Sequence, residues 1–114
     1  MELAVEHMQD GIKKIALKGR MDIEGTDAVD LRLVAETAAE KALVVFDLTG
    51  VEFLASVGIG TLLRSAKALR LRGGEAVLFS TVPVVNLVLE KTRVYEVIRT
   101  FSDLEQARAS LLAR

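Results

Sequence analysis

The chain of 114 residues contains no cysteine and no tryptophan, and it has one proline and one histidine. Without cysteine, disulfides, thiolate metal sites and cysteine nucleophiles are excluded. The single histidine, His7, cannot form a metal site built mainly from histidines. A serine hydrolase triad would have to use it, and no G-x-S-x-G motif accompanies it. We therefore interpret His7 as an ordinary polar residue of a first strand.

The chain also lacks an excess of either charge and any long apolar run. Fifteen basic residues nearly balance sixteen acidic ones, which gives a net charge of −1. Nucleic-acid binding needs a basic patch or a basic excess, so we expect none. No apolar run reaches the ~18 residues of a membrane helix. The N-terminus has no signal-peptide pattern, and we expect a cytoplasmic protein without membrane insertion.

The remaining composition suits a globular domain. Apolar residues make up 51% of the chain, and few of them are aromatic, so aliphatic side chains must fill the interior. A chain of this length is the size of one ordinary domain. We predict a single domain over residues 1–114.

The N-terminal segment predicts an antiparallel hairpin. Residues 2–8 and 12–18 are rich in β-branched and apolar residues, in partial alternation. Asp10-Gly11 between them is a hairpin signal, and so short a connection requires antiparallel strands. We expect Gly19 to end the second strand.

Beyond the hairpin, the spacing of apolar residues becomes helical and then strand-like again. A helix is predicted through 26–39, with Gly25 or Thr26 as its cap. Its helical spacing rests on Ala28, Leu31, Val34, Ala35 and Ala38. The continuous apolar run 42–48 then predicts a strand buried on both faces, which is typical of a central or parallel strand.

The second half of the chain repeats this alternation. It predicts a helix at 57–71, a strand at 75–79, a helix at 83–91, a short edge strand at 95–101 and a last helix ending near 113. Gly73-Gly74 stops the first of these helices, and Pro83 suits the first position of the next. Ser102 and Glu105 form a capping box for the last helix. The order indicates an α/β fold with a mixed sheet of four to five strands and about four helices.

Asp47 lies next to the end of the run 42–48, where response-regulator receivers carry a phospho-acceptor aspartate. That chemistry needs further carboxylates at an earlier strand end to bind magnesium, and the two earlier strands end without an acidic pair. The receiver stays a minor alternative. We favour a structural role in which Asp47 accepts hydrogen bonds from the following turn.

Gly58-Ile59-Gly60 opens the helix at 57–71. Two glycines at this spacing are weak evidence for phosphate binding, because the dinucleotide fingerprint needs a third glycine and position 63 is leucine. We favour the alternative that small residues let the helix start pack closely on the sheet.

Basic residues recur on the same helix. Arg64, Lys67 and Arg70 share one face, and Arg72 follows near the helix end. A solvated face that complements the negative helix C-terminus explains them, and a partner-binding stripe stays open.

Ser56 stands where this helix begins. As an N-cap, its side-chain oxygen would accept a hydrogen bond from the amide of Gly58 or Ile59 and contribute about 1 kcal/mol. On the residues alone, a cap is the favoured interpretation.

The stretch from Asp47 to Gly60 resembles the signature of STAS domains, the fold of bacterial anti-sigma-factor antagonists. That signature is a strand ending in Asp, an apolar-x-aromatic step, and then Asp-Ser-Ser/Thr-Gly-apolar-Gly. The segments 17–22, 69–80 and 94–107 also resemble the family, and Asp22 matches its loop aspartate. The resemblance covers essentially the whole chain in order, and it implies a single STAS domain.

The resemblance implies a non-enzymatic binding module, without cofactor or metal, whose partner is an anti-sigma factor that is also a serine kinase. In switchable members the kinase phosphorylates the serine that matches Ser56, which ends binding, and a PP2C-type phosphatase reverses this. The expected docking face comprises Asp22, Ile23, Ala55, Ser56, Val57, Gly58 and Arg64. We expect a monomer or a weak dimer.

Two positions depart from the signature. Ala55 replaces the family's Asp and Val57 replaces its Ser or Thr. The missing carboxylate bears on recognition by the kinase. Ala55 therefore keeps a second interpretation open, a constitutive scaffold subunit of a transport ATPase complex or stressosome-like particle without a phospho-switch. Nucleotide binding occurs in the family, but no phosphate loop supports it here.

Overall fold

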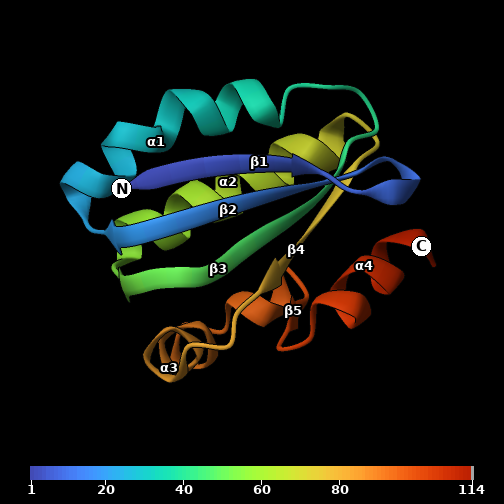
Figure 1. Ribbon diagram of the computed structural model, residues 1–114. Helices are drawn as coiled ribbons and strands as arrows, with labels where there is room; N and C mark the ends of the chain where they lie inside the picture. The colour runs from blue at the N-terminus through green and yellow to red at the C-terminus, as the bar shows by residue number, and fades with distance from the viewer. Residues whose placement is uncertain (114) are drawn as a thin grey trace.

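The computed structural model describes residues 1–113 (Figure 1). In chain order the elements are β1 Glu2–His7, the short 3₁₀ helix η1 Gln9–Gly11, β2 Ile12–Met21, α1 Ile23–Glu36, β3 Leu43–Leu54, α2 Ser56–Leu71, β4 Glu75–Phe79, α3 Pro83–Lys91, the 3₁₀ helix η2 Val94–Glu96, β5 Thr100–Phe101 and α4 Leu104–Leu112. The α/β class and the predicted order of strands and helices are confirmed. Within residues 1–113, no helix combines the length and apolar character that crossing a membrane requires.

The five strands form one mixed sheet in the order β1-β2-β3-β4-β5. β1 and β2 pair antiparallel, as the hairpin signal predicts, and every later neighbour pairs parallel. At the hairpin turn, Asp10 and Gly11 both adopt positive φ angles, 69° and 76°. Aspartate and glycine tolerate this region better than other residues, which is why the turn forms here.

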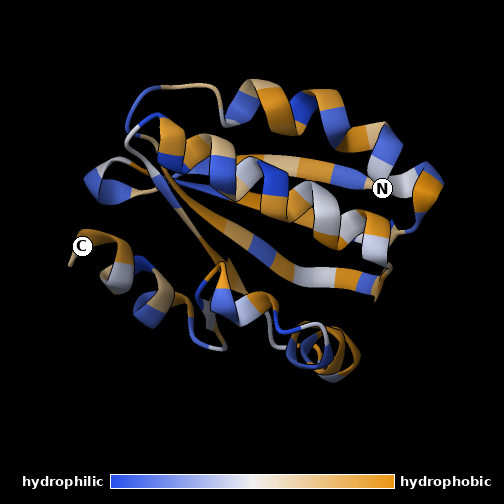
Figure 2. Ribbon diagram, turned by 180° about the vertical axis from the view of Figure 1, so that it is seen from behind, coloured by the Kyte–Doolittle hydropathy of each residue, from blue (hydrophilic) through white to orange (hydrophobic). Residues whose placement is uncertain are grey.

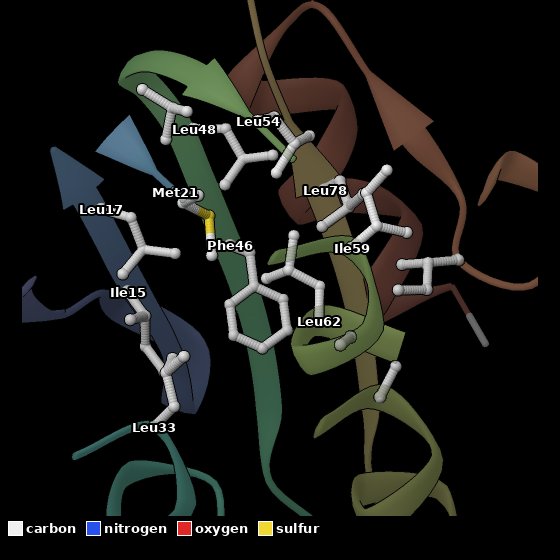
Figure 3. Packing of buried hydrophobic residues seen from close by; sticks show 14 of the residues in the cluster. Ile15, Leu17, Met21, Leu33, Phe46, Leu48, Leu54, Ile59, Leu62 and Leu78 are labelled. Carbon is white, nitrogen blue, oxygen red and sulfur yellow. The ribbon is translucent and has the colours of Figure 1, made fainter. Parts of the chain in front are cut away.

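Helices cover both faces of the sheet. α1, α2 and α3 pack on one face in the larger core cluster, and Figure 3 shows Phe46 between Leu33 of α1 and Leu62 of α2. On the other face, Ala107 and Leu111 of α4 pack against Val45 and its neighbours. β3 lies between these layers, so the prediction of a strand buried on both faces is confirmed.

Strands β2 and β3 both continue past their predicted ends. β2 passes through Gly19, which adopts a φ of 116°, and the register with β3 shifts on either side of it. Pairing then resumes, with Arg20 opposite Phe53 and Met21 opposite Leu54. The predicted stop at Gly19 and the predicted turn after Asp47 are therefore wrong, because parallel pairing extends both strands. The partner strand that supplies this pairing is distant in the sequence.

Helix α1 differs from its prediction in both start and orientation. It begins at Ile23, and its cap is Asp22 rather than Gly25 or Thr26, since the Gly25 amide donates to Oδ1 of Asp22 at 2.8 Å. Leu31 and Val34, whose spacing predicts the helix, lie on its outer side, and the buried apolar side chains are Val29 and Leu33.

In the C-terminal part of the chain, the predicted bounds of β4 and α3 are confirmed, and two other predictions are wrong. β4 and α3 have their predicted bounds. Of the predicted strand 95–101 only its last two residues pair, because Val94 and Ile98 are buried in the larger core cluster and draw the chain away from the sheet edge. The cap of α4 is Asp103, not Ser102: its side chain accepts a hydrogen bond from the Gln106 amide at 2.9 Å.

Candidate functional site

The carboxyl ends of β2 and β3 lie next to one another, and this brings the starts of α1 and α2 together. Met21 and Leu54 are register partners, and the Ala55 amide donates to the carbonyl oxygen of Met21 at 3.1 Å. Asp22 directly follows Met21, and Ser56 directly follows Ala55. Predicted site residues that are distant in sequence thus share one edge of the sheet.

Ser56 is the first residue of α2, and its side chain is exposed. The residue at the N-cap position is Ala55, whose backbone is extended (φ −91°, ψ 168°). The amides of Gly58 and Ile59 donate to the carbonyl oxygen of Ala55 at 3.0 and 3.2 Å, so Ser56 is not the cap and that prediction is wrong. Among residues 1–113, no group hydrogen-bonds to the Ser56 hydroxyl. The hydroxyl is therefore free to meet another molecule.

Asp22 is half-exposed and fixes the start of α1. The hydrogen bond from the Gly25 amide is the main reason that the pKa of Asp22 is lowered, and Arg20, with Nε 3.5 Å from Oδ2, adds to it. A Cβ on Gly25 would lie 1.8 Å from the carbonyl oxygen of Arg20, so the helix can begin this close to β2 only with glycine. Next to Asp22, Ile23 presents an apolar side chain that is 70% exposed.

The two glycines of α2 have different surroundings. A Cβ on Gly58 would lie 2.9 Å from Cβ of Met21 and 3.0 Å from Cδ1 of Leu54, so close packing on the sheet is confirmed for Gly58. Gly58 is buried, and it positions the site without presenting a side chain to it. A Cβ on Gly60 would meet only Nη1 of Arg64, at 3.3 Å.

The remaining predicted residues, Val57 and Arg64, lie at different distances from Ser56. Val57 is partly buried. Arg64 lies two turns further along α2, roughly 12 Å along the axis at 1.5 Å per residue. Its side chain donates to Oγ1 of Thr61 at 3.0 Å and lies over Gly60, toward the Ser56 end of the helix. Arg64 is thus part of the same side of α2 but not of its first turn.

Asp47 lies away from this edge, within β3. It accepts hydrogen bonds from the amide and the hydroxyl of Thr49, at 2.9 and 2.7 Å, as predicted, although these residues belong to the strand and not to a turn. Lys14 Nζ is 3.7 Å from its other carboxylate oxygen. In the part of the chain that the structure describes, no group of three or more Asp, Glu or His residues could hold a metal ion.

The sequence did not single out Arg20 and Phe53 as a site. The guanidinium carbon of Arg20 lies 4.4 Å from the centroid of the Phe53 ring, a cation–π contact across the paired ends of β2 and β3. Both side chains are exposed. The sequence signal that could have found this pair was Phe53, an aromatic residue near the end of a strand. Core packing does not explain an exposed aromatic side chain there.

Two pockets of the described structure lie away from the edge around Ser56. Their volumes are about 310 and 500 Å³, and one lies beside Tyr95 and Phe101 and the other beside His7 and Arg108. The exposed apolar, aromatic and charged side chains at this edge are suited to docking a protein.

Known proteins share this fold. The model of the STAS domain family matches residues 5–107. An anti-sigma factor antagonist from Mycobacterium paratuberculosis is similar in structure, with a TM-score of 0.87 and 23% identity over 97% of this chain and 93% of that one. An anti-sigma-factor antagonist (STAS) domain protein from Planctomyces limnophilus gives 0.80 and 26%, over 97% and 95%. No curated protein sequence matches the chain.

The Bacillus cell fate determinant SpoIIAA has the same fold. Its unphosphorylated form gives a TM-score of 0.77 at 16% identity, over 99% of this chain and 98% of that one. Its phosphorylated form gives 0.68 at 15%, over 96% and 99%. Because the family model matches far more than half of the residues, the chain belongs to the STAS domain family.

Proposed function

We propose that this protein is an anti-sigma-factor antagonist that binds an anti-sigma factor with serine kinase activity and is released when Ser56 is phosphorylated. One observation carries the proposal: the Ser56 hydroxyl, at the first residue of α2 and not at its cap position, is exposed and has no partner among residues 1–113. A PP2C-type phosphatase restores binding. The protein acts in the cytoplasm as a binding module and performs no catalysis itself.

Similarity to two anti-sigma-factor antagonists supports the class of partner. The docking face would comprise Asp22, Ile23, Ala55, Ser56 and Val57 at the sheet edge, with Arg64 beyond them. Gly58 would act from beneath, by holding α2 close to Met21 and Leu54. SpoIIAA, which shares the fold, is known in unphosphorylated and phosphorylated forms, and this supports a switch by phosphate.

The position of Ser56 allows phosphate to end binding without unfolding the protein. A phosphoserine adds a charge of about −1.5 to −2 at pH 7. At the first residue of α2 this charge is favoured by the helix dipole, by roughly 0.3–1 kcal/mol. In a tight interface, by contrast, the dianion loses water, which costs several kcal/mol unless a cation meets it. At about 1.4 kcal/mol per tenfold, this corresponds to a loss of affinity of roughly hundredfold or more.

The kinase step is tested by incubating the protein with ATP and the anti-sigma kinase encoded nearest to its gene. Mass spectrometry of the digested protein is expected to locate phosphate on Ser56 and to find none in Ser56→Ala. The matched control is Ser102→Ala, which removes another exposed serine at a helix start. A kinase that binds the protein and leaves Ser56 unmodified would overturn the switch.

A scaffold without a switch is the second candidate, and Ala55 favours it because the family's usual carboxylate is missing beside the serine. The two candidates differ in the response of partner binding to charge at Ser56. A switch predicts that Ser56→Asp binds the kinase at least roughly hundredfold more weakly than Ser56→Ala. A scaffold predicts similar binding by both variants, measured by calorimetry with Ser102→Asp as the control.

A further inference from the structure

The cavity beside Tyr95 and Phe101 lies at the carboxyl ends of two parallel strands. Ser80 directly follows β4 and Ser102 directly follows β5, and both line the cavity. The Ser80 amide donates to the carbonyl oxygen of Phe101 at 3.0 Å, which joins the two strand ends. Figures 1 and 2 show from opposite sides that α3 and the segment 94–101 flank the end of β4. In open α/β sheets, small ligands bind outside the carboxyl ends of the strands.

Most polar side chains of this cavity have no partner within the chain. Ser80 is buried, and its hydroxyl oxygen accepts a hydrogen bond from the Val82 amide at 3.2 Å. Within residues 1–113, five further lining side chains form no hydrogen bond or ion pair, namely Asn86, Glu90, Tyr95, Thr100 and Ser102. Polar groups that converge on a cavity without partners are available to orient a bound molecule.

The cavity carries an uncompensated negative charge. Among residues 1–113, Glu90 is the only charged residue that lines it, and no cation pairs with Glu90 there. Arg93 and Arg99 lie close in sequence but are engaged elsewhere, Arg93 with Glu96 and Arg99 with a carbonyl oxygen of α4. Lys91 follows Glu90 on α3 and does not line the cavity. The charge therefore favours a cation over a phosphate or another anion.

Two aromatic rings line the same cavity. Tyr95 is 47% exposed, and Phe101 is partly buried. The face of an aromatic ring attracts organic cations, and ammonium groups are commonly recognised by aromatic rings of this kind. The cavity volume of about 310 Å³ is at the lower end of the range for ligand sites, so the ligand must be small.

We propose that this cavity binds a small organic cation, whose ammonium group lies between the Glu90 carboxylate and the rings of Tyr95 and Phe101. The side-chain oxygens of Asn86 and Ser102 would accept hydrogen bonds from its N–H or O–H groups. The proposal does not depend on phosphorylation or on an anti-sigma factor, because none of these residues belongs to the proposed docking face.

The intrinsic fluorescence of the protein provides a direct assay. Tyr95 is the only tyrosine and the chain has no tryptophan, so the tyrosine emission comes from this cavity alone. Titration of the full chain with choline or putrescine is expected to change the emission until it saturates, with a dissociation constant of about 1 mM or lower. Dimethylbutanol and butanediol, which are neutral and resemble choline and putrescine in shape, are expected to leave it unchanged. Calorimetry of the same titrations detects binding that does not alter the emission.

A matched pair of variants tests the role of the carboxylate. Glu90→Gln keeps the shape of the side chain and removes its charge, and it is expected to weaken binding of the cation roughly tenfold or more. Glu40→Gln makes the same change at an exposed glutamate in the connection between α1 and β3, at the opposite end of the sheet, and should bind as wild type does. Circular dichroism checks that both variants are folded.

Three results would overturn the proposal. The first is the absence of binding by both cations at roughly ten times the expected dissociation constant. The second is equal binding of the neutral molecules, which would show that charge plays no part. The third is an unchanged affinity of Glu90→Gln, which would place the cation elsewhere. Binding of either cation with the expected loss in Glu90→Gln supports the site.

Discussion

The backbone amide of Ala55 donates a hydrogen bond to the carbonyl oxygen of Met21, across 3.1 Å. This bond joins the end of β2 to the start of α2, so Asp22 and Ser56 lie on one surface although they are far apart in the sequence. It also holds Ala55 in the N-cap position of α2, where its methyl group offers no acceptor to the helix.

Restoring an acceptor at this position is expected to stabilise the protein. Ala55→Asp should raise the free energy of unfolding by about 0.5–2 kcal/mol, since aspartate caps helix amides that alanine leaves open. Urea denaturation measures the change. Asp103→Ala, which removes the working cap of α4, should lower stability in the same assay. Ser56→Ala should change stability little, and a large loss in that variant would contradict the placement of the cap at Ala55.

The two glycines of α2 are expected to respond in opposite directions to the same substitution. Gly58→Ala should destabilise by roughly 1–3 kcal/mol, because its Cβ would overlap Met21 and Leu54. Gly60→Ala should be neutral or stabilising by up to about 1 kcal/mol, because alanine favours helix and only the movable Arg64 guanidinium is near. Thermal unfolding measures the stability of both variants. Equal changes in stability would contradict the close packing of Gly58.

Asp22 is expected to make stability depend on pH. Its pKa is lowered in the folded protein, chiefly by the hydrogen bond from Gly25, so its charge stabilises the fold above the unfolded-state pKa of about 3.9. This contribution is lost as pH falls through the lower folded-state pKa. Asp22→Ala should therefore lower the melting temperature most near neutral pH, with a difference from wild type that shrinks in acid. Asp22→Asn, which can still cap, should lose less, and a pH-independent loss in the alanine variant would refute the linkage.

The stacked pair of Arg20 and Phe53 is expected to contribute to partner binding. Phe53→Ala should weaken binding to the anti-sigma kinase that we propose as the partner roughly tenfold, since exposed aromatic residues near the centre of an interface often dominate its affinity. Tyr95→Ala removes an aromatic of similar exposure beside α3, away from Ser56, and should bind as wild type does. Calorimetry compares the two variants, and equal affinities would place the interface elsewhere.

Much of the fold could be predicted because its signals are local. The hairpin at Asp10-Gly11 and the start of α3 at Pro83 depend on backbone preferences of the residues themselves. The continuous apolar run of β3 likewise predicted a buried strand. The ends of the strands were harder to predict, because a strand continues as long as the neighbouring strand offers hydrogen bonds. That neighbouring strand is distant in the sequence.

The sequence by itself determined the order of the elements and the position of Ser56 at the start of a helix, because apolar spacing and turn residues act over a few neighbouring positions. The tertiary structure alone decided which side of α1 is buried, since Val29 and Leu33 compete with Leu31 and Val34 for the core. It also decided that Ala55 occupies the cap position and that the Ser56 hydroxyl has no partner among residues 1–113. The physical reason is the same in both cases: parallel pairing of β2 with β3 sets where each helix begins, and thereby which side chains face the sheet or the solvent.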